Sequence, residues 1–196
     1  NVRRVRKGDK VILCSSDGKA ILFDEADARP MGRDTSGVRG ITLKAGATML
    51  GMEISNGKGD LFVITENGYG KRTAVSEYPE HNRGGQGVFT IAMTSKKGKL
   101  VACRVVGPQH ELMIVSEEGV VIRVKSSDVS KLGRSTQGVK VMNMSSSDHV
   151  SAVARMVVHK KKAPKALDEN QGMIDLAAAG AKDADEEEPI DIGDED

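Results

Sequence analysis

The sequence has no tryptophan, and aromatic residues make up only 3% of its 196 positions. Proteins that hold single-stranded nucleic acid usually stack the bases on aromatic side chains. The scarcity of aromatics therefore argues against recognition by stacking. If a nucleic acid is the ligand, contacts to the backbone of a duplex are the expected mode.

Only two cysteines are present, Cys14 and Cys103, and each lies inside a short apolar run. Cysteines placed in this way are predicted to be core thiols rather than a disulfide, which fits a reducing cytoplasm. No apolar run approaches the ~18 residues of a membrane span, and there is no signal peptide. We therefore predict a cytoplasmic location and no membrane partner. The first residue, Asn1, is not methionine, so we interpret the chain as a piece of a longer protein.

Patterns typical of an enzyme are missing as well. No glycine-lysine pair has the upstream glycine of a phosphate-binding P-loop. The histidines stand without a cysteine or acid at metal-ligand spacing, and they are His81, His110, His149 and His159. We expect no catalytic residue, no metal site and no cofactor in this segment.

The formal net charge of +1 hides a strong division of charge along the chain. Residues 1–167 carry +12, whereas residues 168–196 carry −11. The region 159–196 begins with a basic run and ends in an acidic one, and we interpret it as a flexible tail. Within it, residues 167–181 could form a weak helix, and residues 183–196 have the composition of disorder. A basic body with an acidic tail indicates a polyanion-binding surface with a competitor attached to it.

A short motif occurs three times and organises the body of the chain. Each copy has an arginine, a glycine four residues later, and then a valine, as in Arg83, Gly87 and Val88. A second glycine lies 15 residues before each arginine, and the arginines recur at steps of 50 and 51 residues. A period near 50 residues is typical of solenoids, propellers or arrays of small sheets.

Short apolar runs joined by turn residues fill each repeat. Asp17-Gly18 and Asn67-Gly68 stand between such runs, and these dipeptides are strong hairpin signals. We predict an all-β fold without a convincing helix, in which each repeat forms about four short antiparallel strands. A lone small sheet cannot bury both faces, so the repeats should pack as propeller-like blades. The predicted blades cover 10–54, 61–106 and 112–157, and residues 1–9 are interpreted as the end of a preceding blade.

Further strands are expected outside the hairpins. Residues 38–43 are predicted to be a third strand of the first blade, and residues 1–7 are interpreted as the last strand of an earlier repeat. The corresponding segments 88–93 and 139–144 are predicted to be strands of the second and third blades.

Basic residues recur at fixed points of the repeat. Equivalent positions of a ring of blades lie on one rim, so these cations should form a band that matches a phosphate backbone. Glycines beside them let backbone N–H groups approach a phosphate. The candidate DNA-binding residues are Lys19, Arg33, Arg39, Lys71, Arg72, Arg83, Arg123, Arg134 and Lys140.

At these residues the sequence resembles the C-terminal domain of the A subunit of bacterial DNA gyrase. The resemblance is carried by 66–75 with Glu77-Tyr78-Pro79, by 32–40 and by 133–139, and it extends over residues 1 to about 158. It implies a six-bladed β-pinwheel whose blades exchange strands and whose basic rim wraps duplex DNA. The acidic end also resembles the tails of some gyrase A subunits. The family's hallmark Gln-Arg-Arg-Gly-Gly-Lys-Gly box is absent, and 81–87 is a degenerate relative of it.

The resemblance further implies a set of partners. They are double-stranded DNA, the remaining part of the gyrase A subunit, and the gyrase B subunit in an A2B2 holoenzyme that introduces negative supercoils. ATP and Mg would be used elsewhere in that type II topoisomerase, and this segment would be non-catalytic by itself. Two alternatives stay open: the matching domain of topoisomerase IV, and a propeller-like scaffold for protein interactions.

Overall fold

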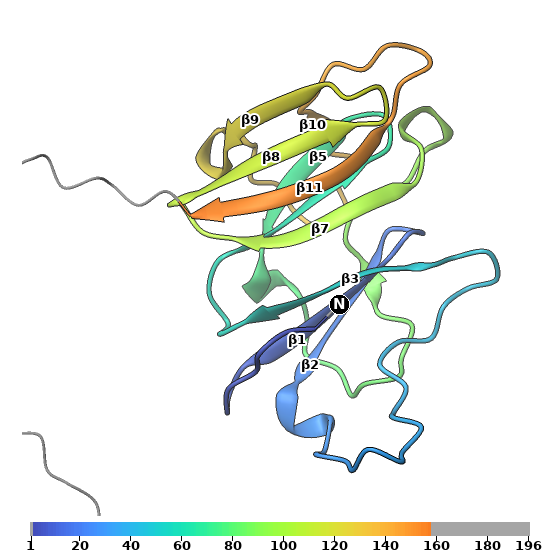
Figure 1. The fold of residues 1–196 in the computed structure, drawn as a ribbon, viewed down its shortest axis with the longest axis vertical. Helices are drawn as coiled ribbons and strands as arrows, with labels where there is room; N and C mark the ends of the chain where they lie inside the picture. The colour runs from blue at the N-terminus through green and yellow to red at the C-terminus, as the bar shows by residue number, and fades with distance from the viewer. Residues whose placement is uncertain (1, 158–196) are drawn as a thin grey trace, which may run out of the picture. The chain divides into compact units, whose positions relative to one another are not determined.

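The predicted hairpins are present in the computed structural model, which describes residues 2–157 (Figure 1). The first sheet has the strand order β3-β1-β2-β6 and contains β1 (Lys10–Ser15), β2 (Lys19–Asp24), β3 (Met49–Ser55) and β6 (Val88–Phe89). The second has the order β10-β5-β4-β7 and contains β4 (Asp60–Thr65), β5 (Tyr69–Ala74), β7 (Leu100–Val106) and β10 (Val139–Lys140). The third has the order β11-β8-β9 and contains β8 (His110–Ser116), β9 (Val121–Lys125) and β11 (Val150–Val157).

All pairings within these sheets are antiparallel, so the all-β prediction is confirmed. The helices of residues 2–157 are single 3-10 turns: η1 (Glu25–Asp27), η2 (Val75–Glu77), η3 (Ser95–Lys97) and η4 (Ser126–Asp128). None of them has the length or the apolar character to cross a membrane. The predicted weak helix at 167–181 and the acidic end lie outside the described residues.

The fourth strand of a sheet comes from the next repeat. β6 belongs to the second repeat but pairs with β2 of the first sheet, and β10 of the third repeat pairs with β5 of the second sheet. The exchange of strands implied by the family resemblance is therefore confirmed. The expectation that each repeat builds its own four strands is wrong.

The predicted strand at 38–43 is absent, and this is a correction with a physical reason. The equivalent segments that start at Val88 and Val139 form only two-residue strands, and each of them pairs with the preceding sheet. Among the described residues, no sheet precedes the first one, so residues 38–43 have no strand to bond to. Residues 2–7 also form no strand, contrary to the interpretation of 1–7 as one.

The motif glycine is needed where the chain crosses onto the preceding sheet. Gly87 and Gly138 have φ angles of +70° and +73°, in the region that favours glycine. A Cβ atom at Gly87 would lie 2.4 Å from the carbonyl oxygen of Ala20, and one at Gly138 would lie 2.9 Å from that of Gly70. The glycine thus permits both the turn and the close backbone approach that starts the exchanged strand.

Alternation along its strands gives the second sheet two buried faces. Ile12 and Leu22 of the first sheet pack on Leu61 and Val63 of the second. The opposite face of the second sheet, which includes Phe62, packs on the third sheet in a separate core. Stacked sheets with interleaved side chains are the packing expected of neighbouring blades.

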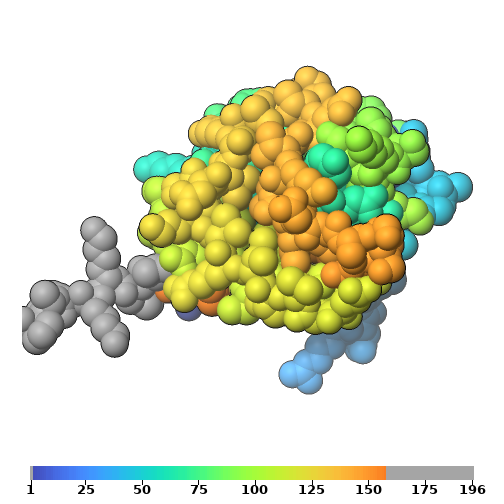
Figure 2. Space-filling view, turned by 90° about the horizontal axis from the view of Figure 1, so that it is seen from above, coloured from blue at the N-terminus to red at the C-terminus, as the bar shows by residue number. Residues whose placement is uncertain are grey.

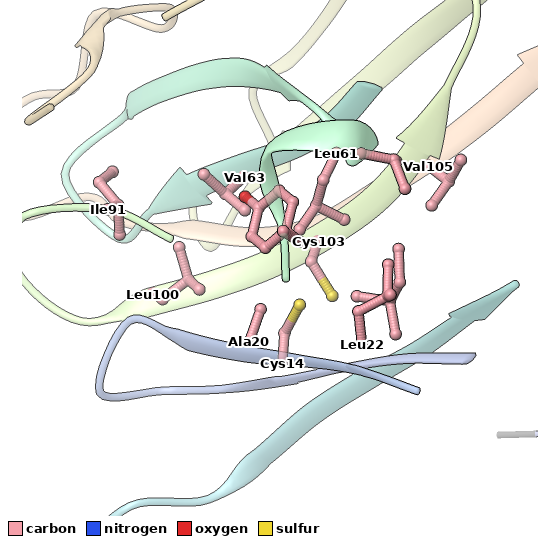
Figure 3. Close-up of a cluster of buried hydrophobic side chains, with 12 residues drawn as sticks. Cys14, Ala20, Leu22, Leu61, Val63, Ile91, Leu100, Cys103 and Val105 are labelled. Carbon is pink, nitrogen blue, oxygen red and sulfur yellow. The ribbon is translucent and has the colours of Figure 1, made fainter. Parts of the chain in front are cut away.

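The two cysteines lie in the core between the first two sheets, where both are fully buried and free. Figure 3 shows the sulfur atoms of Cys14 and Cys103 pointing toward one another from facing strands. A hydrogen bond with the Cys103 thiol and burial both raise the pKa of Cys14. The prediction of core thiols rather than a disulfide is confirmed.

A single carboxylate joins all three sheets. Glu53 of β3 is almost fully buried, and its oxygens lie 3.3, 3.7 and 3.9 Å from guanidinium nitrogens of Arg3, Arg104 and Arg155. Arg104 belongs to β7 and Arg155 to β11, so the three edge strands meet at this side chain. The backbone N–H of Val105 also donates to Glu53 at 3.3 Å.

Candidate nucleic-acid interface

The loops that carry the arginine-glycine motif are joined to one another. The Gly85 carbonyl accepts a hydrogen bond from the Thr42 N–H at 2.9 Å, and the Thr136 carbonyl accepts one from the Ala92 N–H at 3.0 Å. These two contacts occupy equivalent positions, since Thr42 and Ala92 lie at the same distance in sequence from the motif arginine of their own repeat. The second and third motif loops are therefore each fastened to the loop of the repeat before, which places the three copies in one continuous row.

Two motif arginines help to hold this row. Arg83 donates from Nε to the Asp27 carbonyl at 2.8 Å and from Nη1 to the Arg39 carbonyl at 3.2 Å. Arg134 lies 5.9 Å from the centre of the Tyr78 ring and donates to the Phe89 carbonyl at 3.5 Å. Both arginines are half-buried, so they keep their charge close to the surface while bonding neutral carbonyls.

Three of the predicted cations stand free on the surface. Arg33, Arg39 and Lys140 are exposed, and none forms an ion pair with another described residue. Lys140 lies 5.9 Å from the centre of the Tyr69 ring. These three are the predicted site residues whose charge is most available to an external anion.

Three others are engaged within the protein. Arg72 forms an ion pair with Asp60 at 2.8 Å, and Arg123 forms one with Glu111. Lys19 is buried, and its ammonium donates to the Gln86 side chain at 3.0 Å. The spacing of the repeats identified these three basic residues. It could not show that each of them already binds a carboxylate or amide of a neighbouring strand or loop.

Lys71 differs most from its expected place, because it is fully buried. Its ammonium lies under the third motif loop and donates to the carbonyls of Gly133, Arg134 and Thr136 and to the Thr136 hydroxyl, at 2.5 to 3.1 Å. Its equivalent under the second motif loop is Ile21, which lies near Gly85. Lys71 thus supports the loop of Arg134 from below and does not lie on the surface.

The burial of Lys71 predicts a specific pH dependence of stability. The pKa of Lys71 is lowered from 10.5 to about 8, mainly by desolvation; the charge of Glu77 opposes this shift and that of Arg134 adds to it. Below pH 8 the folded and unfolded chains both carry the proton; between the two pKa values the unfolded chain binds more protons. Stability from this group therefore rises with pH in that window, by at most about 3 kcal/mol.

The measurement compares urea unfolding of the parent and a Lys71→Met variant from about pH 7 to 10. The variant lacks the titrating group, so the parent's stability should rise relative to the variant's as the pH increases. A difference between the two proteins that stays constant across this range would contradict the lowered pKa.

Other basic residues next to the row were not among the candidates. Lys96 lies within the η3 turn and Lys99 follows it, and both are exposed. Lys96 lines a pocket of about 230 Å³ together with Lys140, Asn67 and Tyr69. Lys97 is buried between them, 4.7 Å from the Tyr69 ring centre, and donates to the Gln137 carbonyl at 2.8 Å. The basic run at 96–99 is the sequence signal that could have identified these residues.

The three repeats have counterparts among known proteins. The family described as DNA gyrase C-terminal domain, beta-propeller, matches residues 9–56, 59–107 and 110–155. The chain belongs to this family. The A subunit of DNA gyrase from Staphylococcus epidermidis is 39% identical over 157 residues, and that from Staphylococcus aureus is 38% identical over the same length. The match covers 79% of this chain but 18% of either relative, so the chain spans about a fifth of their length.

Solved structures place the chain in the same family by shape. A DNA gyrase A C-terminal domain superposes with a TM-score of 0.72 and 30% identity, over 78% of this chain and 52% of that one. The C-terminal domain of a DNA topoisomerase IV also reaches a TM-score of 0.72, but at 20% identity, which shows a shared fold alone. The gyrase family is therefore the better supported of the two interpretations.

Proposed function

We propose that this chain is a non-catalytic module that binds and wraps duplex DNA as part of a DNA gyrase A subunit. The observation that carries the proposal is the continuous row of motif loops, fastened to one another and bearing exposed cations. A protein that bends DNA needs contacts spread along an arc, because the contacts must offset the cost of bending. A row of equivalent loops on successive sheets supplies that spacing.

The chemistry of the row suits phosphates rather than base edges. Arg33, Arg39 and Lys140 are free to bind an anion, and the pocket beside Lys140 also receives Lys96. Cations that neutralise phosphates give affinity with little sequence preference. We therefore expect this module to bind duplexes of different sequence with similar affinity.

In the whole protein, the module would present DNA to a cleavage core formed elsewhere. The partners in this proposal are the rest of the gyrase A subunit, together with the gyrase B subunit in an A2B2 assembly. That assembly would use ATP and Mg outside this segment for negative supercoiling in the cytoplasm. The fold shared with topoisomerase IV keeps that enzyme as the second candidate. The 39% identity to a gyrase A subunit favours gyrase.

The salt dependence of duplex binding tests the proposal. If ~4–6 phosphates are neutralised, the logarithm of the association constant should fall against log salt with a slope of about −4 to −5. Fluorescence anisotropy with two labelled duplexes of unrelated sequence measures this slope. A weak, salt-independent signal would support the protein-interaction scaffold instead.

Variants then locate the contacts. Replacing Arg33, Arg39 and Lys140 together with alanine should weaken binding and make the salt slope about 2 to 3 shallower, since about one ion is released per contact. The matched control is Arg123→Ala, which removes an exposed cation that is paired with Glu111. An equal loss of binding free energy per removed cation in both proteins would show that overall charge, and not the row, determines binding.

A further inference from the structure

A small pocket lies where the second and third repeats join, beside the strand β10 that the third repeat adds to the second sheet. It has a volume of about 230 Å³, and its polar lining comes from Asn67, Tyr69, Lys96, Lys140, Ser145 and Ser146. Figure 2 shows residues of the third repeat, in orange, against residues of the second, in green, on the visible face. Because its lining includes Lys96 and Lys140, we call it the lysine pocket.

The charge of the lysine pocket is positive. Lys96 and Lys140 are exposed, and neither forms an ion pair with another described residue. Two ammonium groups share the ring of Tyr69, since that of Lys97 lies 4.7 Å and that of Lys140 lies 5.9 Å from its centre. Among the described residues, no carboxylate lines the pocket. These cations therefore have no counter-charge beside them.

The acids that are close in sequence are occupied elsewhere. The side chain of Glu66 lies against Gly98, where an added Cβ atom would be 2.1 Å from its Cγ. Asp148 is buried and accepts from the N–H groups of Glu118 and His149. Desolvation and then the charge of Lys96 lower the pKa of Lys97, as expected of cations that no acid balances.

The equivalent pocket where the first and second repeats join has a different chemistry. It has a volume of about 290 Å³, and its lining includes Lys44, Lys99 and Asp17. Asp17 and Asn67 occupy the same position of the hairpin turn in successive repeats, so a carboxylate stands there in place of an amide. That carboxylate competes with any external anion for the two lysines.

A cation and an aromatic residue face one another at both junctions, but their places are exchanged. Lys140 of β10 pairs with Tyr69 of β5, whereas Phe89 of β6 pairs with Lys19 of β2. Lys19 is buried and bonded to Gln86, and it does not line the first pocket. Lys140 is exposed and lines the second. Within residues 2–157, only the later junction presents this cation to solvent.

The size and the donors of the lysine pocket suit one phosphate group. Sites for drug-sized ligands have volumes of about 300–1,000 Å³, so this pocket is too small for a whole nucleotide. Lysine ammonium groups bind phosphate as point charges. Ser145 and Ser146 are exposed, and their hydroxyl groups can donate to phosphate oxygens.

We propose that the lysine pocket binds one phosphate of the DNA backbone and that the equivalent pocket of the first junction does not. The assignment of the phosphate to DNA rests on the function proposed above, whereas the affinity of the pocket for phosphate does not. Contacts to phosphates fix the position of a protein on a duplex. This single site therefore determines where the DNA crosses from the second sheet to the third.

Inorganic phosphate tests the pocket without DNA. Amide chemical shifts of the full chain are followed by NMR as sodium phosphate replaces sodium chloride at constant ionic strength and pH. We expect saturable shifts at 67–69, 96–97, 140 and 145–146, and none at 16–17 and 44–47. Asn67→Asp should abolish them, because it places in this pocket the carboxylate that the first pocket has. The absence of saturable shifts in the parent would overturn the proposal.

The same variant tests the contact with DNA. Asn67→Asp should lower the affinity for a duplex by about tenfold, because the new charge lies beside the bound phosphate. Aspartate still accepts from the His149 ring and loses only the donation to the Lys96 carbonyl. Asn56→Asp is the matched control of equal charge. Asn56 is exposed and precedes β4, whereas Asn67 follows it, so the control should lower the affinity by less than about twofold.

A second pair of variants removes a cation instead. Lys96→Gln should weaken duplex binding and make the salt slope about 1 shallower, whereas the exposed Lys58→Gln should change neither. Urea unfolding checks that each variant is folded. Equal effects within either pair, with duplex binding by the parent, would overturn the proposal and leave the proposed function standing. Phosphate-dependent shifts in a parent that binds no duplex would mark a site for free phosphate, and would overturn both the DNA assignment and the proposed function.

Discussion

Replacing Glu53 with glutamine is expected to lower the free energy of unfolding by ~3–5 kcal/mol. The carboxylate is 2% exposed and faces Arg3, Arg104 and Arg155. Glutamine has nearly the same shape and can still accept from the Val105 N–H, but it removes the negative charge that the three guanidinium groups share. The three cations would then repel one another at the point where β3, β7 and β11 meet.

Thermal and urea unfolding of the parent and the Glu53→Gln variant measure this effect. For a chain of this size, a loss of ~3–5 kcal/mol corresponds to a Tm lower by about 10 °C. Glu111→Gln is the matched control, because Glu111 pairs with the exposed side chain of Arg123 within a single sheet. Exposed pairs contribute about 0–1 kcal/mol, so a similar loss in both variants would rule out a special role for Glu53.

The hairpins and the stacking of sheets could be predicted from the sequence because their causes are local. Asp17-Gly18 and Asn67-Gly68 specify turns through a positive φ angle, and alternation along β4 assigns Leu61 and Phe62 to opposite cores. The family resemblance added the exchange of strands. From the sequence pattern alone, residues 88–93 were assigned to the second blade, because strands that are close in sequence are expected to pair in the same sheet.

The wrong prediction of a strand at residues 38–43 has the same cause. Residues 38–43 and 88–93 have similar patterns of apolar residues. The sequence pattern therefore could not show that 88–93 has a neighbouring strand to pair with and that 38–43 has none. Hydrogen bonds between strands depend on an edge supplied by another part of the fold.

The candidate interface was predictable in its loops but not in its individual charges. The spacing of Arg33, Arg83 and Arg134 placed all three on equivalent loops, and the structure joins those loops in a row. The roles of Lys71 and Arg72 depend on side chains 12 to 65 residues away, which no local pattern specifies. Buried lysines are rare because desolvation is costly, and the carbonyls that satisfy Lys71 come from the loop that it supports.

Deleting residues 168–196 is expected to tighten duplex binding by about tenfold or more at low salt. This segment carries −11 beside a body of +12, and it is joined covalently to that body. An attached polyanion competes with DNA for the same cations at a high effective concentration, so its removal should increase the apparent affinity. The gain should shrink as salt rises, because screening weakens the competition and the DNA contacts together.

Anisotropy titrations of the full chain and of residues 1–167 at two salt concentrations measure the effect. A chain of full length with its acidic residues from Asp168 onward changed to asparagine and glutamine is the matched control, since it keeps the length and removes the charge. If charge is the cause, this control should bind DNA like the truncated protein. Equal affinity of the full and truncated chains at low salt would show that the acidic segment does not compete for the cations of the motif loops.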